Sequence, residues 1–160
     1  MSDPILTPTY GVAPAVTGFG DVIFISADGG TTFKQLMHTK GIKYNGQQKN
    51  KIDTSTTTNT GGYQSSIGAL KDPGTLDFSM IFDPSDAAQL LLISSYDSDI
   101  TLQVRHVYHA TPGYSSGRIN AFDAWVQKCP VPSSDESAVT AMDVSLQVTG
   151  PITVTDAVAE

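Results

Sequence analysis

The side chains best suited to acid–base or metal chemistry are three histidines and one cysteine: His38, His106, His109 and Cys129. On a β-strand, residues three apart point to opposite faces, so His106 and His109 cannot ligate one metal ion together. Cys129 precedes Pro130 and has no histidine near it in the sequence, which is typical of an inert thiol. These residues predict no metal site and no thiol nucleophile.

Phosphate-binding and catalytic motifs are also missing from the sequence. Gly61-Gly62 is not followed by Lys-Ser or Lys-Thr, so it does not match a phosphate-binding loop. No nucleophile elbow, zinc-binding helix or dinucleotide fingerprint occurs. We therefore expect a protein without catalytic residues, cofactor or metal, and not an enzyme. Most aspartates occur where turns or caps are expected, at Asp28, Asp72, Asp83, Asp97, Asp99 and Asp135.

The composition favours strands and turns over helices. The 160 residues are enough for one domain with its own core. Asp outnumbers Glu by 14 to 2, and the chain also has 18 Thr and 14 Gly; Asp favours turns and caps, whereas Thr favours strands. The net charge of −7 opposes binding to DNA phosphates. No signal peptide or membrane-spanning run is recognisable, so we expect synthesis in a cytoplasm and no membrane contact.

Hydrophobic alternation predicts about seven strands and one helix in a single domain, residues 1–160. Residues 1–18 contain three prolines and are expected to form an extended arm, or else a frayed terminus. Residues 45–72 are expected to form a hairpin that turns at Asn45-Gly46, with a return strand over 51–57, and a long polar loop over 54–66. Further strands are expected at 21–27, 33–44, 74–83, 99–109, 118–129 and 137–149.

One segment has the start signals of a helix, which we expect over residues 84–96. Asp83 is the predicted N-cap and Pro84 the first helical residue. Strands run before and after this helix without βαβ repetition, which favours mainly antiparallel sheets in a β-sandwich or partial barrel with one flanking helix. The predicted buried face of the helix consists of Ala87, Leu90, Leu91 and Ser94.

The lysines are concentrated in one part of the chain. Between residues 34 and 52 there are five lysines and no acidic residue, so this segment carries +5 and the remainder about −12, given the total of −7. A basic hairpin on an acidic body suits head-to-tail self-association. Alternatively, the lysines protect an exposed strand edge from unwanted pairing. The predicted self-assembly residues are Lys34, Lys40, Lys43, Lys49, Lys51 and Tyr63.

Three stretches resemble the tail tube protein (major tail protein) of long-tailed bacteriophages. They are 68–84 (GALKDPGTLDFSMIFDP), 144–152 (VSLQVTGPI) and 51–54 (KIDT) before the polar loop. The ordered set of elements covers roughly residues 20–155. The same fold occurs in contractile-tail and type VI secretion tubes, and the 68–84 stretch favours the long flexible tail.

The resemblance implies a structural virion protein of the tail. Such subunits are β-sandwiches that form six-fold rings, and the rings stack into a hollow tube for DNA. The implied partners are further copies of the chain, a tape-measure protein and tail-end proteins, with DNA passing through the lumen without specific binding. Six copies would carry about −42, six times the charge of one chain, and an acidic lumen would not bind DNA. The candidate lumen residues are Asp77, Asp143, Ser145 and Gln147.

Two other classes of function compete with this interpretation. A carbohydrate- or receptor-binding β-sandwich module would display aromatic side chains on its surface. Here Trp125 and most phenylalanines are expected in alternating core positions, which favours the tube subunit. A hydrolase on a β-scaffold is the third possibility, and the sequence offers no residue set for it.

Overall fold

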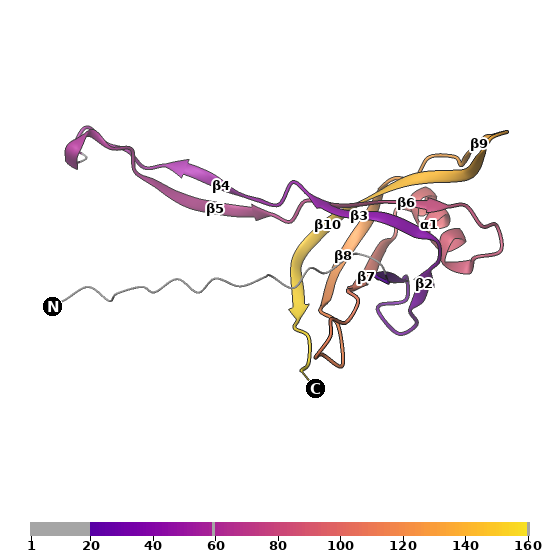
Figure 1. Ribbon diagram of the computed structural model, residues 1–160. Coiled ribbons are helices and arrows are strands. Elements are labelled where there is room, and N and C mark those ends of the chain that lie inside the picture. The colour runs from indigo at the N-terminus through magenta and orange to yellow at the C-terminus, as the bar shows by residue number, and fades with distance from the viewer. Residues whose placement is uncertain (1–19, 59, 160) are drawn as a thin grey trace.

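The computed structural model describes residues 20–58 and 60–159 (Figure 1). The arm expected over residues 1–18 therefore lies outside the described residues. One α-helix, α1 (Ala87–Ser98), and a short 3-10 turn, η1 (Thr60–Gly62), accompany the strands of this part of the chain. The strands are β1 (Val22–Ser26), β2 (Lys34–Leu36), β3 (Thr39–Asn45), β4 (Gln48–Asp53), β5 (Ser66–Asp72), β6 (Thr75–Ile81), β7 (Thr101–Val107), β8 (Ile119–Lys128), β9 (Ser133–Asp135) and β10 (Ala138–Thr155).

All the strand pairs described are antiparallel, as expected. The large sheet has the order β2-β1-β7-β8-β10-β6-β3, and β9 pairs with one end of β10. The two outer strands, β2 and β3, do not pair with each other, so the barrel is not closed. The sheet curls, which brings strands that are not neighbours in the sheet together: the Tyr44 ring of β3 packs against the rings of His106 on β7 and Phe122 on β8. The fold is thus mainly β with one helix.

The core lies inside the curled sheet, with α1 packed against β8 and β2. Burial alternates along β6, β7 and the middle of β10, so every second residue there faces the core. Phe122, Ala124 and Val126 of β8 are likewise buried. The inward residues of the other three strands are Leu76, Phe78 and Met80; Leu102, Val104 and His106; and Met142, Val144, Leu146 and Val148.

The helix begins three residues later than predicted. Asp86, not Asp83, is the N-cap, and its Oδ1 accepts a hydrogen bond of 3.0 Å from the Ala88 N–H. Asp83 instead accepts from the N–H and Oγ of Ser85 in the preceding turn. The predicted buried face is therefore wrong: Leu90 is 48% exposed, and the buried helical residues are Ala88, Gln89, Leu92 and Ser95.

Buried Gln89 explains why the helix takes this orientation. Its Nε2 donates to the backbone carbonyls of Met37 and Ile81, at 3.3 and 3.0 Å, and its Oε1 accepts from the Asp83 N–H at 2.9 Å. One polar side chain therefore fixes α1 to the segment between β2 and β3 and to the end of β6. Buried amides require such partners, so the hydrogen bonds select this face of the helix.

The predicted hairpin at Asn45-Gly46 is wrong. Strand β3 pairs with β6, and β4 pairs with β5, so β4 does not return along β3. The chain instead leaves β3 and continues into a two-stranded ribbon, β4–β5. The described residues of the polar segment, 54–58 and 60–65, form the far tip of this ribbon as a loop with the short turn η1, and the Thr54 N–H donates to the Ser65 carbonyl.

Two strands also differ from expectation in length. The strand expected over 33–44 is split into β2 and β3, because His38 adopts a left-handed conformation with φ of 59°. Strand β10 does not end at Gly150-Pro151. Its register with β8 shifts between Thr149 and Thr153, and Gly150, with φ of 75°, lets the strand continue.

Among the residues described, no helix is long and apolar enough to cross a membrane.

Candidate self-assembly surfaces

The β4–β5 ribbon projects away from the rest of the molecule (Figure 1). Every residue of β4 is exposed, and all residues of β5 except Ala69 are exposed as well. An isolated two-stranded hairpin is only marginally stable in water. The ribbon nevertheless carries large apolar side chains, and clustered exposed apolar groups mark interaction sites. These side chains are Ile52, Tyr63, Ile67 and Leu70, and the last is 82% exposed.

The root of the ribbon is rigidly attached to the sheet. Gly74 has φ of 76°, and a Cβ at this position would lie 2.0 Å from the Asn45 carbonyl oxygen. The Gly74 N–H donates to Asp72, and its carbonyl accepts from the Val148 N–H and Gln147 Nε2, both at 3.0 Å. Only glycine fits this close crossing of two backbones. The direction of the ribbon is therefore fixed by β10.

The structure separates the five lysines that the sequence grouped into one basic hairpin. Lys34 lies on β2, Lys40 and Lys43 lie on β3, and only Lys49 and Lys51 lie on the ribbon. The ribbon gains a third lysine from β5, because Lys71 is directly opposite Lys49 in register. Like charges placed opposite each other destabilise a strand pair. Lys49, Lys51 and Lys71 thus form a basic group between Asp72 at the ribbon root and Asp53 toward its tip, and Tyr63 follows η1 at the tip itself.

The four predicted lumen residues lie together on the outward face of β6 and β10. Ser145 is opposite Asp77 in register, and its Oγ donates to Asp77 Oδ1 at 2.5 Å. Asp143 is opposite Ser79, whose Oγ donates to Asp143 Oδ1 at 2.5 Å. Gln147 reaches Gly74 at the ribbon root. Asp77 also accepts from Asn45 Nδ2 on β3.

Lysines share this outward face with the aspartates. Lys43 is opposite Asp77 across β3 and β6, and Lys128 is opposite Ser145 across β8 and β10. Both lysines line a shallow groove with Asp77 and Asp143. The surface is therefore mixed in charge, and Lys43 belongs to it although the sequence grouped Lys43 with the assembly residues. Lys128 was missed, because only the register of β8 with β10 brings it here.

The opposite end of the molecule from the ribbon, formed by α1 and β9, is acidic (Figure 1). No Lys or Arg occurs between Asp72 and Val104, or after Lys128. Apolar side chains are also exposed at this end, including Leu90 on α1 and Val139 on β10. We call this surface the acidic end; its acidic residues are Asp83, Asp86, Asp97, Asp99, Asp135 and Glu136.

The structure corrects the expected position of Trp125. Its side chain is 42% exposed, since β8 turns Ala124 and Val126 inward and Trp125 outward. In register it lies opposite Thr101 of β7 and Gln147 of β10. An indole on a polar sheet face is a feature of carbohydrate-binding surfaces as well as of protein interfaces.

The described residues contain no group of three or more His, Cys, Asp or Glu side chains that could hold a metal ion. Burial, with a smaller effect of nearby Asp97, raises the pKa of the Cys129 thiol, which disfavours the nucleophilic thiolate. Four of the six aspartates predicted at turns or caps accept hydrogen bonds from the backbone N–H groups that follow them: Asp28, Asp72, Asp83 and Asp135. Asp99 is the C-cap of α1, whereas the prediction is wrong for Asp97, which lies inside the helix.

The fold is similar to that of chains in phage-like tails and injection machines. No protein-family model and no curated protein sequence matches this chain. A chain in the C6-symmetric tail of an empty gene transfer agent particle superposes with a TM-score of 0.69 at 10% identity, over 88% of this chain and 99% of that one. A chain in the anti-feeding prophage baseplate gives 0.70 at 8%, over 91% and 98%.

A third match extends the comparison to contractile machines. A chain in the sheath–tube complex of the extracellular contractile injection system PVC, in its extended state, gives a TM-score of 0.66 at 7% identity, over 89% of this chain and 92% of that one. This chain therefore has the phage-tail-like tube fold, which confirms the fold implied by the sequence resemblance.

Proposed function

We propose that this chain is a structural subunit, without catalytic activity, that assembles with copies of itself into six-fold rings stacked as the hollow tube of a phage-like tail. The observation that carries the proposal is the β4–β5 ribbon, which is exposed at every strand residue except Ala69, partly apolar, and anchored to the sheet at Gly74. A segment of this kind needs a partner surface to cover it. The tube fold supports a second copy as that partner, and residues 1–160 would act as one tube domain.

The acidic end offers a matching surface on the neighbouring copy. The ribbon presents Lys49, Lys51 and Lys71 beside exposed apolar side chains, and the acidic end presents aspartates beside Leu90 and Val139. The two surfaces lie at opposite ends of the molecule, so they pair head to tail and the contact repeats from ring to ring. The self-assembly role of Lys34, Lys40 and Tyr63 remains part of this proposal.

The outward face of β6 and β10 is the proposed lumen surface. Asp77 and Asp143 alternate there with Lys43 and Lys128, so the face lacks the excess of positive charge that binds phosphates. DNA and a tape-measure protein would pass along it without specific binding. The tube would be part of the virion tail, closed at its ends by other tail proteins.

Electron microscopy of the purified protein at high concentration tests the assembly. Tubes of uniform width with an axial repeat are expected for the natural sequence. Replacing Ile67 and Leu70 by Ser should leave the subunit folded and abolish tubes, because both side chains are exposed in the isolated subunit. Val158→Ser is the matched control, since Val158 is also exposed but lies far from the ribbon in the sequence. Tubes that survive the ribbon substitutions would contradict the proposal.

The exposure of Trp125 favours a second candidate, a carbohydrate-binding module. The indole stands on a polar face beside Thr101 and Gln147, where a sugar ring could stack. Binding of the isolated subunit to a glycan array, lost in Trp125→Ala, would support this candidate. Tubes without glycan binding would reject it.

A further inference from the structure

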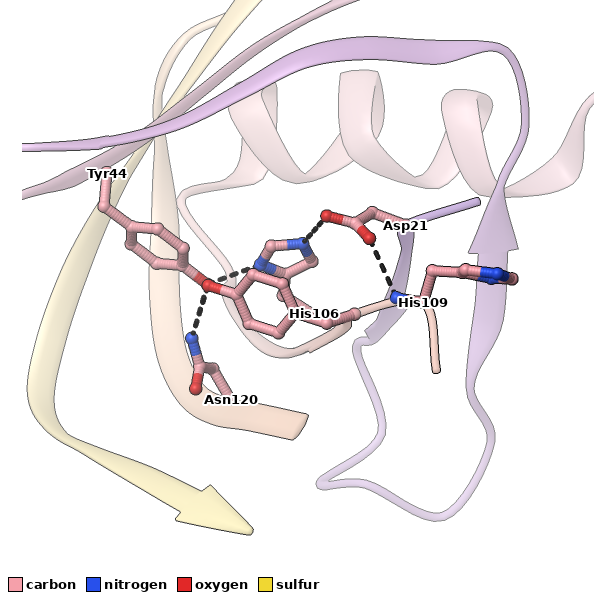
Figure 2. Close-up of polar contacts among 6 residues, drawn as sticks. Asp21, Tyr44, His106, His109 and Asn120 are labelled. Atoms are coloured by element: carbon pink, nitrogen blue, oxygen red, sulfur yellow. Dashed lines mark hydrogen bonds and ion pairs between the residues drawn. The ribbon is translucent and has the colours of Figure 1, made fainter. Parts of the chain in front are cut away.

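A chain of buried polar side chains crosses the core between β3 and β7 (Figure 2). His106 is 2% exposed, and its Nδ1 lies 3.0 Å from the Tyr44 hydroxyl on β3. On its other side, His106 Nε2 lies 3.5 Å from Oδ2 of Asp21, the residue immediately before β1. The imidazole on β7 therefore contacts two other elements: β3, which is the strand that leads into the ribbon, and the beginning of β1.

The proposal below requires one arrangement of donors and acceptors in this polar cluster. Burial raises the pKa of Tyr44 to about 12, so the phenol keeps its proton, and in the proposed arrangement it donates that proton to His106 Nδ1. The Tyr44 oxygen in turn accepts from Asn120 Nδ2 at 3.4 Å. With Nδ1 as acceptor, the proton of a neutral imidazole is on Nε2, which lies 3.5 Å from Asp21 Oδ2 but forms no hydrogen bond within the described residues. Asp21 is held in place by the His109 N–H, which donates to Oδ1 at 2.8 Å.

A second proton on His106 is incompatible with this arrangement. The new Nδ1–H would point at the Tyr44 oxygen, and the Tyr44 proton would lose its acceptor. Burial opposes the imidazolium most strongly, whereas Asp21 attracts it, and the balance lowers the pKa of His106. Two other ionisable groups lie at the cluster. Tyr108, just after β7, packs its ring against the His106 ring. Arg118, just before β8, partly offsets the rise in the Tyr44 pKa through its positive charge.

We propose that neutral His106 is an acid-sensitive fastener that holds β3, and with it the root of the ribbon, against β7 and the beginning of β1. Because its pKa is lower in the folded state, the stability it contributes is complete above about pH 6.5 and is lost as pH falls through the lowered pKa. Acid therefore loosens β3 before the rest of the sheet. The proposal concerns the isolated subunit and holds whether or not the chain forms tubes.

Titration of His106 by NMR of the isotopically labelled subunit tests the fastener directly. At neutral pH the ring should be the Nε2-protonated tautomer, with a midpoint below that of an unstructured histidine. Tyr44→Phe removes a hydrogen bond to the neutral ring and should raise the midpoint, whereas Asp21→Asn removes a carboxylate and should lower it. Shifts in opposite directions are the expected result. An ordinary midpoint in the natural protein, or shifts in one direction, would overturn the proposal.

Hydrogen exchange supplies a second measurement that needs no substitution. After correction for intrinsic rates, the amides of β3 should lose protection as pH falls from neutral through the NMR titration midpoint of His106, while those at the centre of β10 keep theirs. Equal behaviour of the two strands would overturn the proposed release of β3, even if His106 titrates as expected.

Discussion

The carboxylate of Asp86 accepts hydrogen bonds from two distant parts of the backbone, one of them the N–H of Met37 at 3.2 Å. Its other oxygen caps α1 through the Ala88 N–H. Asp86→Ala should therefore lower the free energy of unfolding by about 1–2 kcal/mol, the usual cost of losing an N-cap. Urea denaturation measures this change. Asp86→Asn keeps one acceptor oxygen and should cost less; an equal cost would contradict the capping role.

Charge reversal on the ribbon tests the head-to-tail contact. Lys49→Glu with Lys71→Glu would place two carboxylates against the acidic end, and the critical concentration for tubes should rise at least about tenfold, equivalent to about 1.4 kcal/mol. Adding Asp135→Lys and Glu136→Lys should restore assembly. Sedimentation of polymer measures the concentration. Failure of the second pair to restore assembly would place the ribbon's partner surface elsewhere.

Gly74→Ala should destabilise the subunit by about 1–3 kcal/mol, because the new Cβ combines an unfavourable φ with a clash against the Asn45 carbonyl. Gly150→Ala is the matched control, since Gly150 has nearly the same φ but nothing within 4 Å of an added Cβ. The difference between the two variants in chemical denaturation isolates the clash. If both lose equal stability, the close crossing at the ribbon root is not a constraint.

Asp28 predicts a pH dependence in strong acid. The Ser26 hydroxyl, followed by the Thr32 N–H, stabilises its carboxylate and lowers its pKa to about 2. The stability this provides is present above the ordinary pKa of about 3.8 and is lost as pH falls through 2. The difference in melting temperature between the natural protein and Asp28→Asn should therefore narrow from pH 5 to pH 2. A constant difference would contradict this origin of the stability.

The loop over residues 54–66 should exchange its amide hydrogens quickly in the isolated subunit and slowly in assembled tubes. The loop residues 54–58 and 61–66 are exposed, and at the ribbon tip the Thr54 N–H donates to the Ser65 carbonyl. Mass spectrometry of exchanged subunits and tubes compares the two states. Equal rates would show that the tip does not contact a neighbouring copy.

Strand faces and turns could be predicted from the sequence because they depend on neighbouring residues. The alternation of Leu76, Phe78 and Met80 determines which side of β6 is buried, whatever strand lies beside it. Asp28 and Asp135 similarly act on N–H groups within four residues. Such local features can therefore be predicted without knowledge of the strand pairing.

Pairing partners could not be predicted in the same way. Asn45-Gly46 is a common hairpin turn, yet β3 pairs with β6, because that pairing continues the buried sheet and packs Tyr44 against Phe122. The start of α1 depended on Gln89 reaching Met37, a contact far away in the sequence. Trp125 was expected in an alternating core position, although the phase of β8 turns it outward.

The composition of the candidate surfaces depends even more strongly on the register between paired strands. The lumen residues were chosen as outward positions, and the pairing of Ser145 with Asp77 brings them together. The basic segment was read as one hairpin, whereas its lysines lie on three strands, and the ribbon's third lysine, Lys71, comes from outside it. No count of charges along the chain could show that Lys43 faces Asp77.

The continuity of β10 has a mechanical consequence. Near its beginning the strand pairs with β9 beside the acidic end, and further along, Val148 and Gln147 hold the backbone of Gly74 at the ribbon root. A pull on the ribbon is therefore transmitted along a single extended backbone to the opposite end of the subunit. In a stack of such subunits, tensile load would pass from the ribbon root to β10 through the hydrogen bonds at Gly74, and then along the covalent backbone of β10 toward the contact with the next copy.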